Sequence, residues 1–204
     1  MDKAQAGQTL ELIRSLMERT CQYQLLTARA GLAAGCLAGV GALLFNPWLL
    51  DERHPGHFAA IWTMVFVGAL LATCVGSLMR GRELGEKVWS RQARAVLLAL
   101  APSLAAALVL SVFFFAHGLH LWLPGVWMLC YGQGALATAA YAPAPIRWLG
   151  CTTLLLGALT LWLGPAWATL MMGLVFGLGH IGLGFVLLMA ERRQARLRLY
   201  RGVA

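Results

Sequence analysis

The chain alternates between long apolar stretches and short polar segments. Six apolar stretches take up most of the 204 residues: Ala30–Leu50, Phe58–Met79, Ala95–Ala116, Leu121–Ala142, Trp148–Gly164 and Ala166–Ala190. A run of roughly 18 or more apolar residues without charge is typical of a helix that crosses a bilayer. The pattern therefore predicts an all-α membrane protein with six transmembrane helices, and the connections are too short to hold a second domain.

The composition agrees with a membrane protein and leaves few enzyme classes open. Hydrophobic residues make up 60% of the chain and charged residues 12%, whereas a soluble domain averages about 45–50% and about 25%. All eight acidic residues lie outside the apolar stretches, which argues against a pump that works through buried carboxylates. The sequence shows neither a glycine-rich phosphate loop nor an exposed serine–histidine–acid set.

The chain divides into three parts. Residues 1–29 are polar, but Leu10, Ile13, Met17, Cys21 and Gln24 recur at helical spacing, which predicts an amphipathic helix on the cytoplasmic membrane surface. The alternative is a polar helix that touches nothing. Residues 30–190 form the predicted six-helix membrane domain, and residues 191–204 form a basic cytoplasmic tail.

The basic residues orient the helices. Lys and Arg near the ends of membrane spans stay in the cytoplasm. Fifteen of the sixteen basic residues precede the first stretch, follow the last, or lie between stretches two and three or four and five; Arg53 alone lies on the other side. We therefore expect a multi-pass, six-span protein with both termini cytoplasmic. The net charge of +8 then reflects topology, and no nucleic-acid-binding motif accompanies it.

Short outer connections and glycine spacing indicate how the helices pack. Connections of a few residues predict three antiparallel hairpins, formed by stretches one and two, three and four, and five and six. The first stretch carries Gly31, Gly35 and Gly39, and the last carries Gly173, Gly177 and Gly184. Such stripes let helices approach closely in a membrane. We expect them to serve internal packing, with dimerisation as the alternative, and we expect His180 on the same face of the last stretch.

His180 is the only histidine or charged residue inside the six stretches. It falls near the membrane middle, where charge costs several kcal/mol, so we expect a neutral imidazole. A proton relay, a ligand contact or an axial haem ligand is one interpretation. The other is a structural hydrogen bond to Gln133, Tyr131, Thr138 or a backbone carbonyl, and Gln133 would lie at a similar depth.

Four histidines form a second group at the outer surface. His54 and His57 lie three residues apart in the first outer connection, beside Asp51 and Glu52, and His117 and His120 repeat that spacing in the second. Imidazole and carboxylate groups suit zinc, copper or iron, and paired histidines could hold a haem. No cofactor is predicted as the first choice; haem or a transition metal is the alternative, because histidines at helix ends are also common.

The tail carries five arginines: Arg192, Arg193, Arg196, Arg198 and Arg201. Each would gain about 1 kcal/mol near an anionic membrane surface. We expect this tail to contact anionic lipid headgroups or a cytoplasmic protein partner.

Five stretches look familiar: Ile13–Thr20, Gly85–Arg91, Tyr131–Gly134, Ile146–Gly150 and Phe176–Gly182. Together, over nearly the whole chain, they resemble an uncharacterised family of small bacterial six-span inner-membrane proteins, which implies a multi-pass protein of the bacterial inner membrane. The family offers no activity to carry over, although the resemblance implies a regulatory partner on the cytoplasmic side.

Three functions follow from these observations. The first is a non-enzymatic sensing or accessory subunit that couples to a cytoplasmic partner through its N-terminus, the 80–94 connection and the tail. The second is a haem- or metal-binding redox subunit that uses the outer histidines or His180. The third is a small-solute transporter, which usually shows broken helices and polar groups at the membrane middle.

Overall fold

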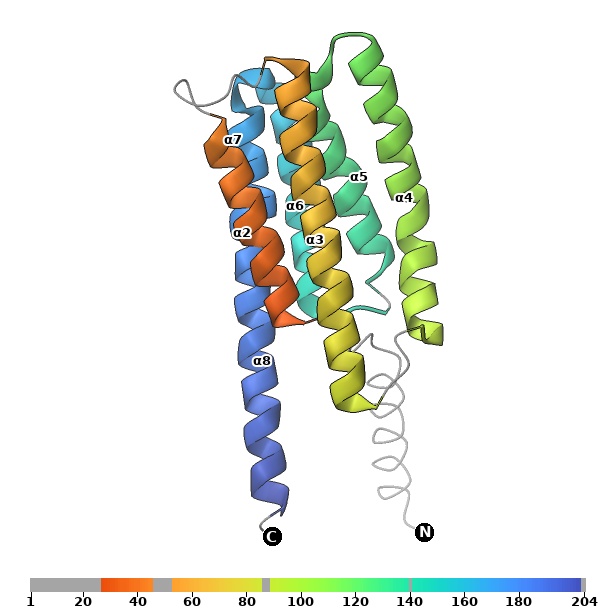
Figure 1. Ribbon diagram of the computed structural model, residues 1–204, viewed down its shortest axis with the longest axis vertical. Helices are drawn as coiled ribbons and strands as arrows, with labels where there is room; N and C mark the ends of the chain where they lie inside the picture. Colours follow the sequence, from red (N-terminus) through yellow and green to blue (C-terminus); the bar gives the residue numbers. More distant parts are fainter. Residues whose placement is uncertain (1–26, 46–52, 86–88, 140, 203–204) are drawn as a thin grey trace, which may run out of the picture.

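The computed structural model describes residues 27–45, 53–85, 89–139 and 141–202, and every regular element in these ranges is a helix. The helices lie side by side along one long axis (Figure 1). They are α2 (Ala28–Leu44), α3 (Pro55–Leu84), α4 (Arg91–Ala116), the 3₁₀ turn η1 (His120–Trp122), α5 (Leu123–Ala137), α6 (Ala144–Leu163), the 3₁₀ turn η2 (Pro165–Trp167), α7 (Ala168–Met172), the π turn η3 (Gly173–Leu178) and α8 (Gly179–Gly202).

Local sequence explains where the helices begin and end. Thr27 and Ser90 each cap a helix, because their hydroxyl oxygens accept from the backbone N–H groups of Ala30 and Ala93 at 3.2 Å and 3.1 Å. Such caps satisfy N–H groups that the first turn leaves free. α3 ends at Gly85 (φ 67°), and Gly164 (φ 84°) joins α6 to η2. Both angles lie in the region that glycine tolerates best.

Four helical segments within the described residues are long and apolar enough to cross a membrane: Pro55–Glu83, Arg91–Ala116, Ala144–Leu163 and Pro165–Arg193. These correspond to the second, third, fifth and sixth predicted stretches. The first and fourth give shorter helices, since α2 has 17 residues and α5 has 15, and about 20 are needed to span the hydrocarbon core. Six spans thus remain a prediction, although the helical membrane character is clear.

Successive helices run in alternating directions (Figure 1). This alternation brings most of the described basic residues to one end of the bundle. One end of the bundle, which we call the basic end, contains the start of α2, the end of α3, the starts of α4 and α6 and the far part of α8. It holds Arg29, Arg80, Arg82, Arg91, Arg94, Arg147, Arg192 and Arg193. At the opposite end Arg53 is the described basic residue.

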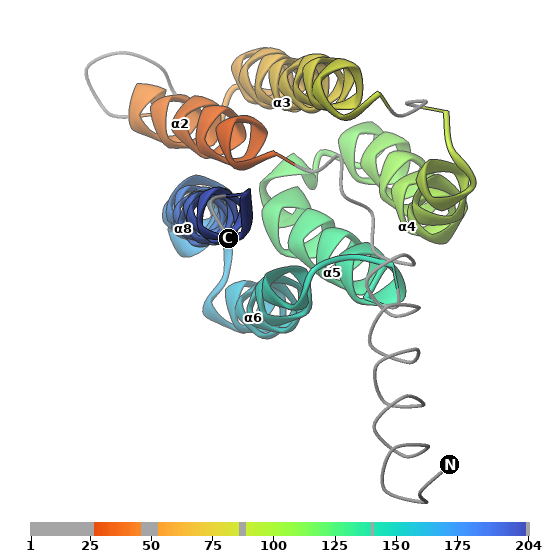
Figure 2. The same cartoon turned by 90° about the horizontal axis from the view of Figure 1, so that it is seen from below.

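Two pairs of helices approach each other closely. α2 lies against η3 and α8, and α5 lies against α6, as the end-on view shows (Figure 2). α3 packs mainly on α2, and α4 mainly on α5. The end-on view places α8 between α2 and α6, next to α5.

Glycine is what brings these backbones together. A Cβ atom added to Gly35 would lie 2.7 Å from the carbonyl oxygen of Gly177, and one added to Gly184 would lie 2.8 Å from the Leu32 nitrogen. The α5–α6 pair is built the same way, because a Cβ on Gly132 would lie 2.9 Å from the carbonyl oxygen of Gly150. Close backbone approach is a main source of helix association in a membrane, where lipid is as apolar as leucine.

The interior side chains form two apolar clusters. The one toward the Arg53 end is rich in aromatic residues, and its buried members come from α3, α5 and α7: Phe58, Trp62, Leu123 and Met172. The one toward the basic end is aliphatic, with buried members Ala28, Leu149, Leu183 and Leu187.

Outside these clusters the surface is apolar. Leu98, Leu108 and Val109 of α4 are 72%, 68% and 68% exposed, and Trp162 of α6 is 90% exposed. A surface this apolar is consistent with helices that face lipid.

Some expectations fall outside the described residues. These are the N-terminal amphipathic helix before Thr27, and the part of the first outer connection that holds Asp51 and Glu52. Helix α4 continues through Pro102, as transmembrane helices often do where neighbours accommodate the missing N–H.

Substituting Gly35 by alanine tests the close α2–α8 approach. The new methyl group meets backbone atoms of Gly177 and Ile181 at 2.7 Å, and overpacking of this kind costs about 1–3 kcal/mol. We expect Gly35→Ala to lower the free energy of unfolding by about that amount in lipid–detergent micelles. Gly39→Ala is the matched control on the same helix, because its methyl group meets nothing within 4 Å. Equal stability of the two variants would contradict this packing.

Candidate functional site

A hydrogen bond joins Tyr131 of α5 to His180 of α8 in the interior. The Tyr131 hydroxyl and the His180 Nε2 atom lie 2.8 Å apart, and both side chains are partly buried. The site thus joins two elements 49 residues apart in the chain. Of the partners that the sequence suggested for His180, Tyr131 is the one with which it bonds.

Phe176 completes an aromatic group with this pair. Its ring stacks on that of His180 at a centroid distance of 5.9 Å and meets the Tyr131 ring edge-on at 5.3 Å. Phe176 belongs to the π turn η3, one turn before His180. Packing on both sides therefore fixes the orientation of the imidazole.

The second ring nitrogen of His180 has no hydrogen-bond partner. Nδ1 is buried, and no group in the described part of the chain completes a bond with it. The backbone carbonyl groups of Val175 and Phe176 approach the ring from the preceding turn. Neither contact has the geometry of a full hydrogen bond to Nδ1. A buried polar atom of this kind costs about 1–3 kcal/mol, so it is a natural point for a water molecule, a ligand or a change of conformation.

The Thr153 hydroxyl is another buried polar group without a hydrogen bond within the described residues. Thr153 lies on α6 and is 0% exposed. Most threonines and serines inside helices bond to a carbonyl of their own helix. Thr138 and Thr160 do so, donating to the carbonyl oxygens of Ala135 and Leu156 at 2.7 Å, so Thr138 is not a partner of His180.

Gln133 lies on a different face of α5 from Tyr131. Its side chain is exposed, because two residues along a helix are turned about 200° from each other and do not share a face. A similar depth in the membrane is therefore not enough to bring Gln133 to His180. The Gln133 amide faces the outside of the bundle.

The glycines that the sequence singled out meet between α2 and the last helix. A Cβ on Gly31 would lie 3.3 Å from Gly184 Cα, one on Gly177 would lie 3.3 Å from Gly39 Cα, and one on Gly173 would lie 2.9 Å from Ala42 Cβ. The same Cβ on Gly31 would lie 3.4 Å from the His180 carbonyl oxygen. His180 thus shares the glycine face through its backbone, while its ring reaches α5.

The four outer histidines do not form one cluster. The rings of His54 and His57 lie 4.4 Å apart and are exposed. His117 is exposed, and its Nδ1 lies 2.8 Å from the carbonyl oxygen of Phe113. His120 is 6% exposed and packs between Phe58 and Phe115, at 5.5 Å and 5.8 Å.

No three His, Cys, Asp or Glu side chains in the described ranges are grouped to hold a metal ion. Asp51 and Glu52 lie outside those ranges, so the haem or metal hypothesis stays a prediction.

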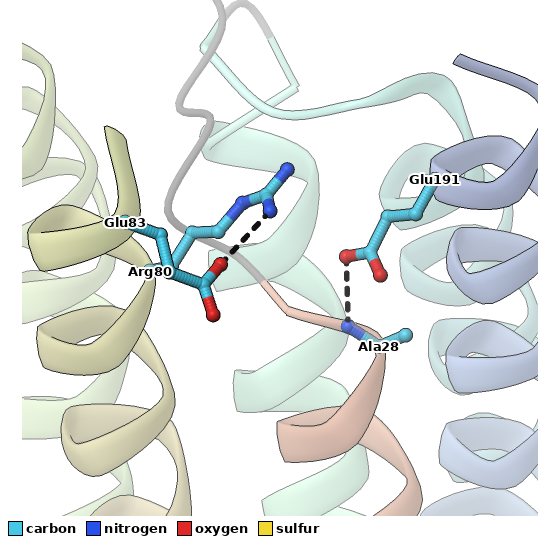
Figure 3. A network of polar contacts seen from close by, with 4 residues as sticks. All are labelled: Ala28, Arg80, Glu83 and Glu191. Carbon is cyan, nitrogen blue, oxygen red and sulfur yellow. Dashed lines mark hydrogen bonds and ion pairs between the residues drawn. The ribbon is translucent and has the colours of Figure 1, made fainter. Parts of the chain in front are cut away.

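A carboxylate marks the point where α8 leaves the bundle. The Glu191 Oε1 atom accepts from the backbone N–H of Ala28, the first residue of α2, at 3.5 Å (Figure 3). A negative charge at a helix N-terminus is stabilised by free N–H groups and the helix dipole. On α3 at the same end, Arg80 pairs with Glu83 at 3.2 Å (Figure 3).

Beyond Glu191, α8 continues to Gly202 as a helix that extends past the ends of α2 and α6 (Figure 1). Arg192 and Arg193 are exposed there. The side chains of Arg196, Arg198 and Arg201 lie outside the described part, although their backbone is helical. We call residues 192–202 the arm.

No protein-family model, curated protein or solved structure matches this chain.

Sequence reasoning missed three residues that the structure singles out. Phe176 looked like one more apolar residue, Thr153 like an ordinary helical threonine, and Glu191 like a tail residue beside the arginines. For Glu191 a signal existed, because it is the first charged residue after the last apolar stretch. Its partner, the start of α2, is 163 residues away.

Removing the Tyr131 hydroxyl tests the pair. Tyr131→Phe keeps the ring contacts and deletes one interhelical hydrogen bond, which averages about 0.6 kcal/mol and reaches about 1.7 kcal/mol in membrane bundles. We expect a loss in that range in the free energy of unfolding. Tyr141→Phe, at an exposed position, is the matched control and should leave it unchanged. A stable Tyr131→Phe variant would contradict the bond.

Proposed function

We propose that this chain is a six-span protein of the bacterial inner membrane, with both termini in the cytoplasm, that acts as a non-enzymatic sensing or accessory subunit. Its basic arm contacts a cytoplasmic protein partner and anionic lipid headgroups. The observation that carries the proposal is the arm itself, a helix that continues beyond the contact of Glu191 with α2.

The length and charge of the arm support this role. Its 11 residues would extend about 16 Å at a rise of 1.5 Å per residue, and five of them are arginines. An apolar helix that ended at the membrane surface would not need this extension. Exposed arginines suit both phosphate groups and the carboxylates of an acidic partner.

The basic end supports the orientation. Arg29, Arg82 and Arg147 begin or end three different helices at the end where the arm emerges. The positive-inside rule puts that end in the cytoplasm. α2 and α5 would complete the six spans as short, tilted or locally thinned crossings, which membranes accommodate at modest cost.

The interior pair supports a sensing role. Tyr131 and His180 form one polar contact among apolar helices, and His180 lies on the helix that continues into the arm. Intramembrane ionisable residues are commonly functional. A change at this pair can thus reach the cytoplasmic end through one helix.

Labelling of single cysteines tests the topology. In a variant whose five cysteines are replaced by alanine, a cysteine at Leu119 should react with a membrane-impermeant maleimide in intact spheroplasts. A cysteine at Gly202 should react only after the membrane is opened. Labelling of Gly202 in intact spheroplasts would place the arm outside and reject the proposal.

Photo-crosslinking tests the partner. A photoreactive residue at Arg196 should capture a defined protein in cells, identified by mass spectrometry, whereas the same residue at Leu119 serves as the control. Replacing the remaining arm arginines by glutamine should reduce the capture at least several-fold, because it removes the charges that would pair with carboxylates of an acidic partner. Capture of the same proteins at both positions, or of lipid alone at Arg196, would reject the protein partner.

A further inference from the structure

The last transmembrane helix contains one turn of different geometry. Residues Gly173–Leu178 form a π turn between α7 and α8. Such turns hold one extra residue inside an α-helix and occur often at functional sites. This one lies directly before His180, and Phe176 within it stacks on the His180 ring.

Three contacts below the π turn depend on the register of α8. His180 bonds to Tyr131 of α5 at 2.8 Å. Gly184 lies so close to α2 that a Cβ would meet the carbonyl oxygen of Ala28 at 3.0 Å. Glu191 accepts from the first N–H of α2 at 3.5 Å. Because α8 is continuous from Gly179 to Gly202, these contacts and the arm move together.

The alternative register follows from helix geometry. If η3 became α-helical, each residue of α8 would advance about 1.5 Å and turn about 100° relative to α7. Each residue would then take the place now held by the next one. Ala190 would replace Glu191 at the start of α2, and Gly179 would replace His180 beside Tyr131.

The glycine contact opposes this change. In the alternative register Leu183 would take the place of Gly184, where even a methyl group meets the Leu32 nitrogen at 2.8 Å. The α2 helix would have to move away before α8 could turn. The present contacts therefore hold the extra residue inside η3.

We propose that η3 is a register switch for α8: release of the Tyr131–His180 contact and of the close α2 packing converts the π turn to α-helix and turns the arm by about 100°. The regulatory meaning of this step rests on the proposed function of the arm, while the step itself does not. Packed helices with two discrete arrangements are a common basis of switching.

Deletion of one residue inside η3 tests whether the π turn holds one extra residue. Without Leu174, which is 38% exposed, η3 can become α-helical while α8 keeps all three contacts. We expect this variant to fold with wild-type stability. Deletion of Val186, an exposed residue of α8, is the matched control, because it shifts Glu191 away from Ala28 and should destabilise the bundle. Deletion of Leu178 is a second test of the turn, and misfolding of both η3 deletions would overturn the proposal.

Spin-label distances test the motion. In the chain without its native cysteines, spin labels on new cysteines at Arg147 and Arg198 report the distance between the start of α6 and the arm. Adding Tyr131→Phe together with Gly35→Ala, so that both contacts are released, should create a second distance population, displaced on the order of 8 Å for a helix about 10 Å across. In the chain that also lacks Leu174 this population should be absent, because no extra residue remains to be released. Tyr141→Phe should change neither chain.

The comparison separates a switch from a structural role. If Tyr131 only stabilised the bundle, its loss would broaden the distances equally with and without Leu174, and that result would overturn the proposal. An unchanged distribution in both chains would overturn it as well. The measurement needs no partner, so a negative photo-crosslink would refute the function of the arm without affecting the register result.

Discussion

The structure depends on close approach of helix backbones at glycine. In water, burial of apolar side chains would hold such helices together, but a lipid environment offers apolar surface of its own. The described helices pack most closely where side chains are absent, at Gly35 and Gly184 in one interface and at Gly132 and Gly150 in the other. α3 and α4 lack such an extensive interface, and each rests mainly on one neighbour.

This packing also determines the environment of the polar pair. The α2–α8 contact places α8 so that His180 reaches Tyr131, and the α5–α6 contact places the helix that carries Tyr131. Two interfaces with close backbone approach thus give three features of this pair. These are the Tyr131–His180 hydrogen bond, the stacking of Phe176 on His180 and the Nδ1 atom without a hydrogen bond in the described part of the chain. The imidazole is thus bonded to Tyr131 through one nitrogen, while its other nitrogen has no hydrogen bond within the described residues.

The sequence was sufficient for the all-helical fold with long apolar helices, for the uneven distribution of arginines and for Tyr131 as one candidate partner of His180. It was insufficient for details that depend on rotation about the helix axis. Gln133 and Tyr131 are two residues apart, and only the packing of α5 decides which of them faces α8. The α5–α6 glycines were readable in principle, because Gly125 and Gly132, like Gly150 and Gly157, are seven residues apart. The π turn was not readable, because an extra residue in a turn leaves no periodic signal in a short apolar stretch.

The contact of Glu191 with Ala28 has a consequence for how the protein is made. The first N–H of α2 is satisfied by a carboxylate that emerges from the ribosome 163 residues later, roughly 10–30 s at 5–20 residues per second. During that interval the α2 helix has neither its carboxylate nor its glycine-lined neighbour. Until the last helix is made, α2 therefore rests mainly on α3, and its glycine-lined face lacks a partner.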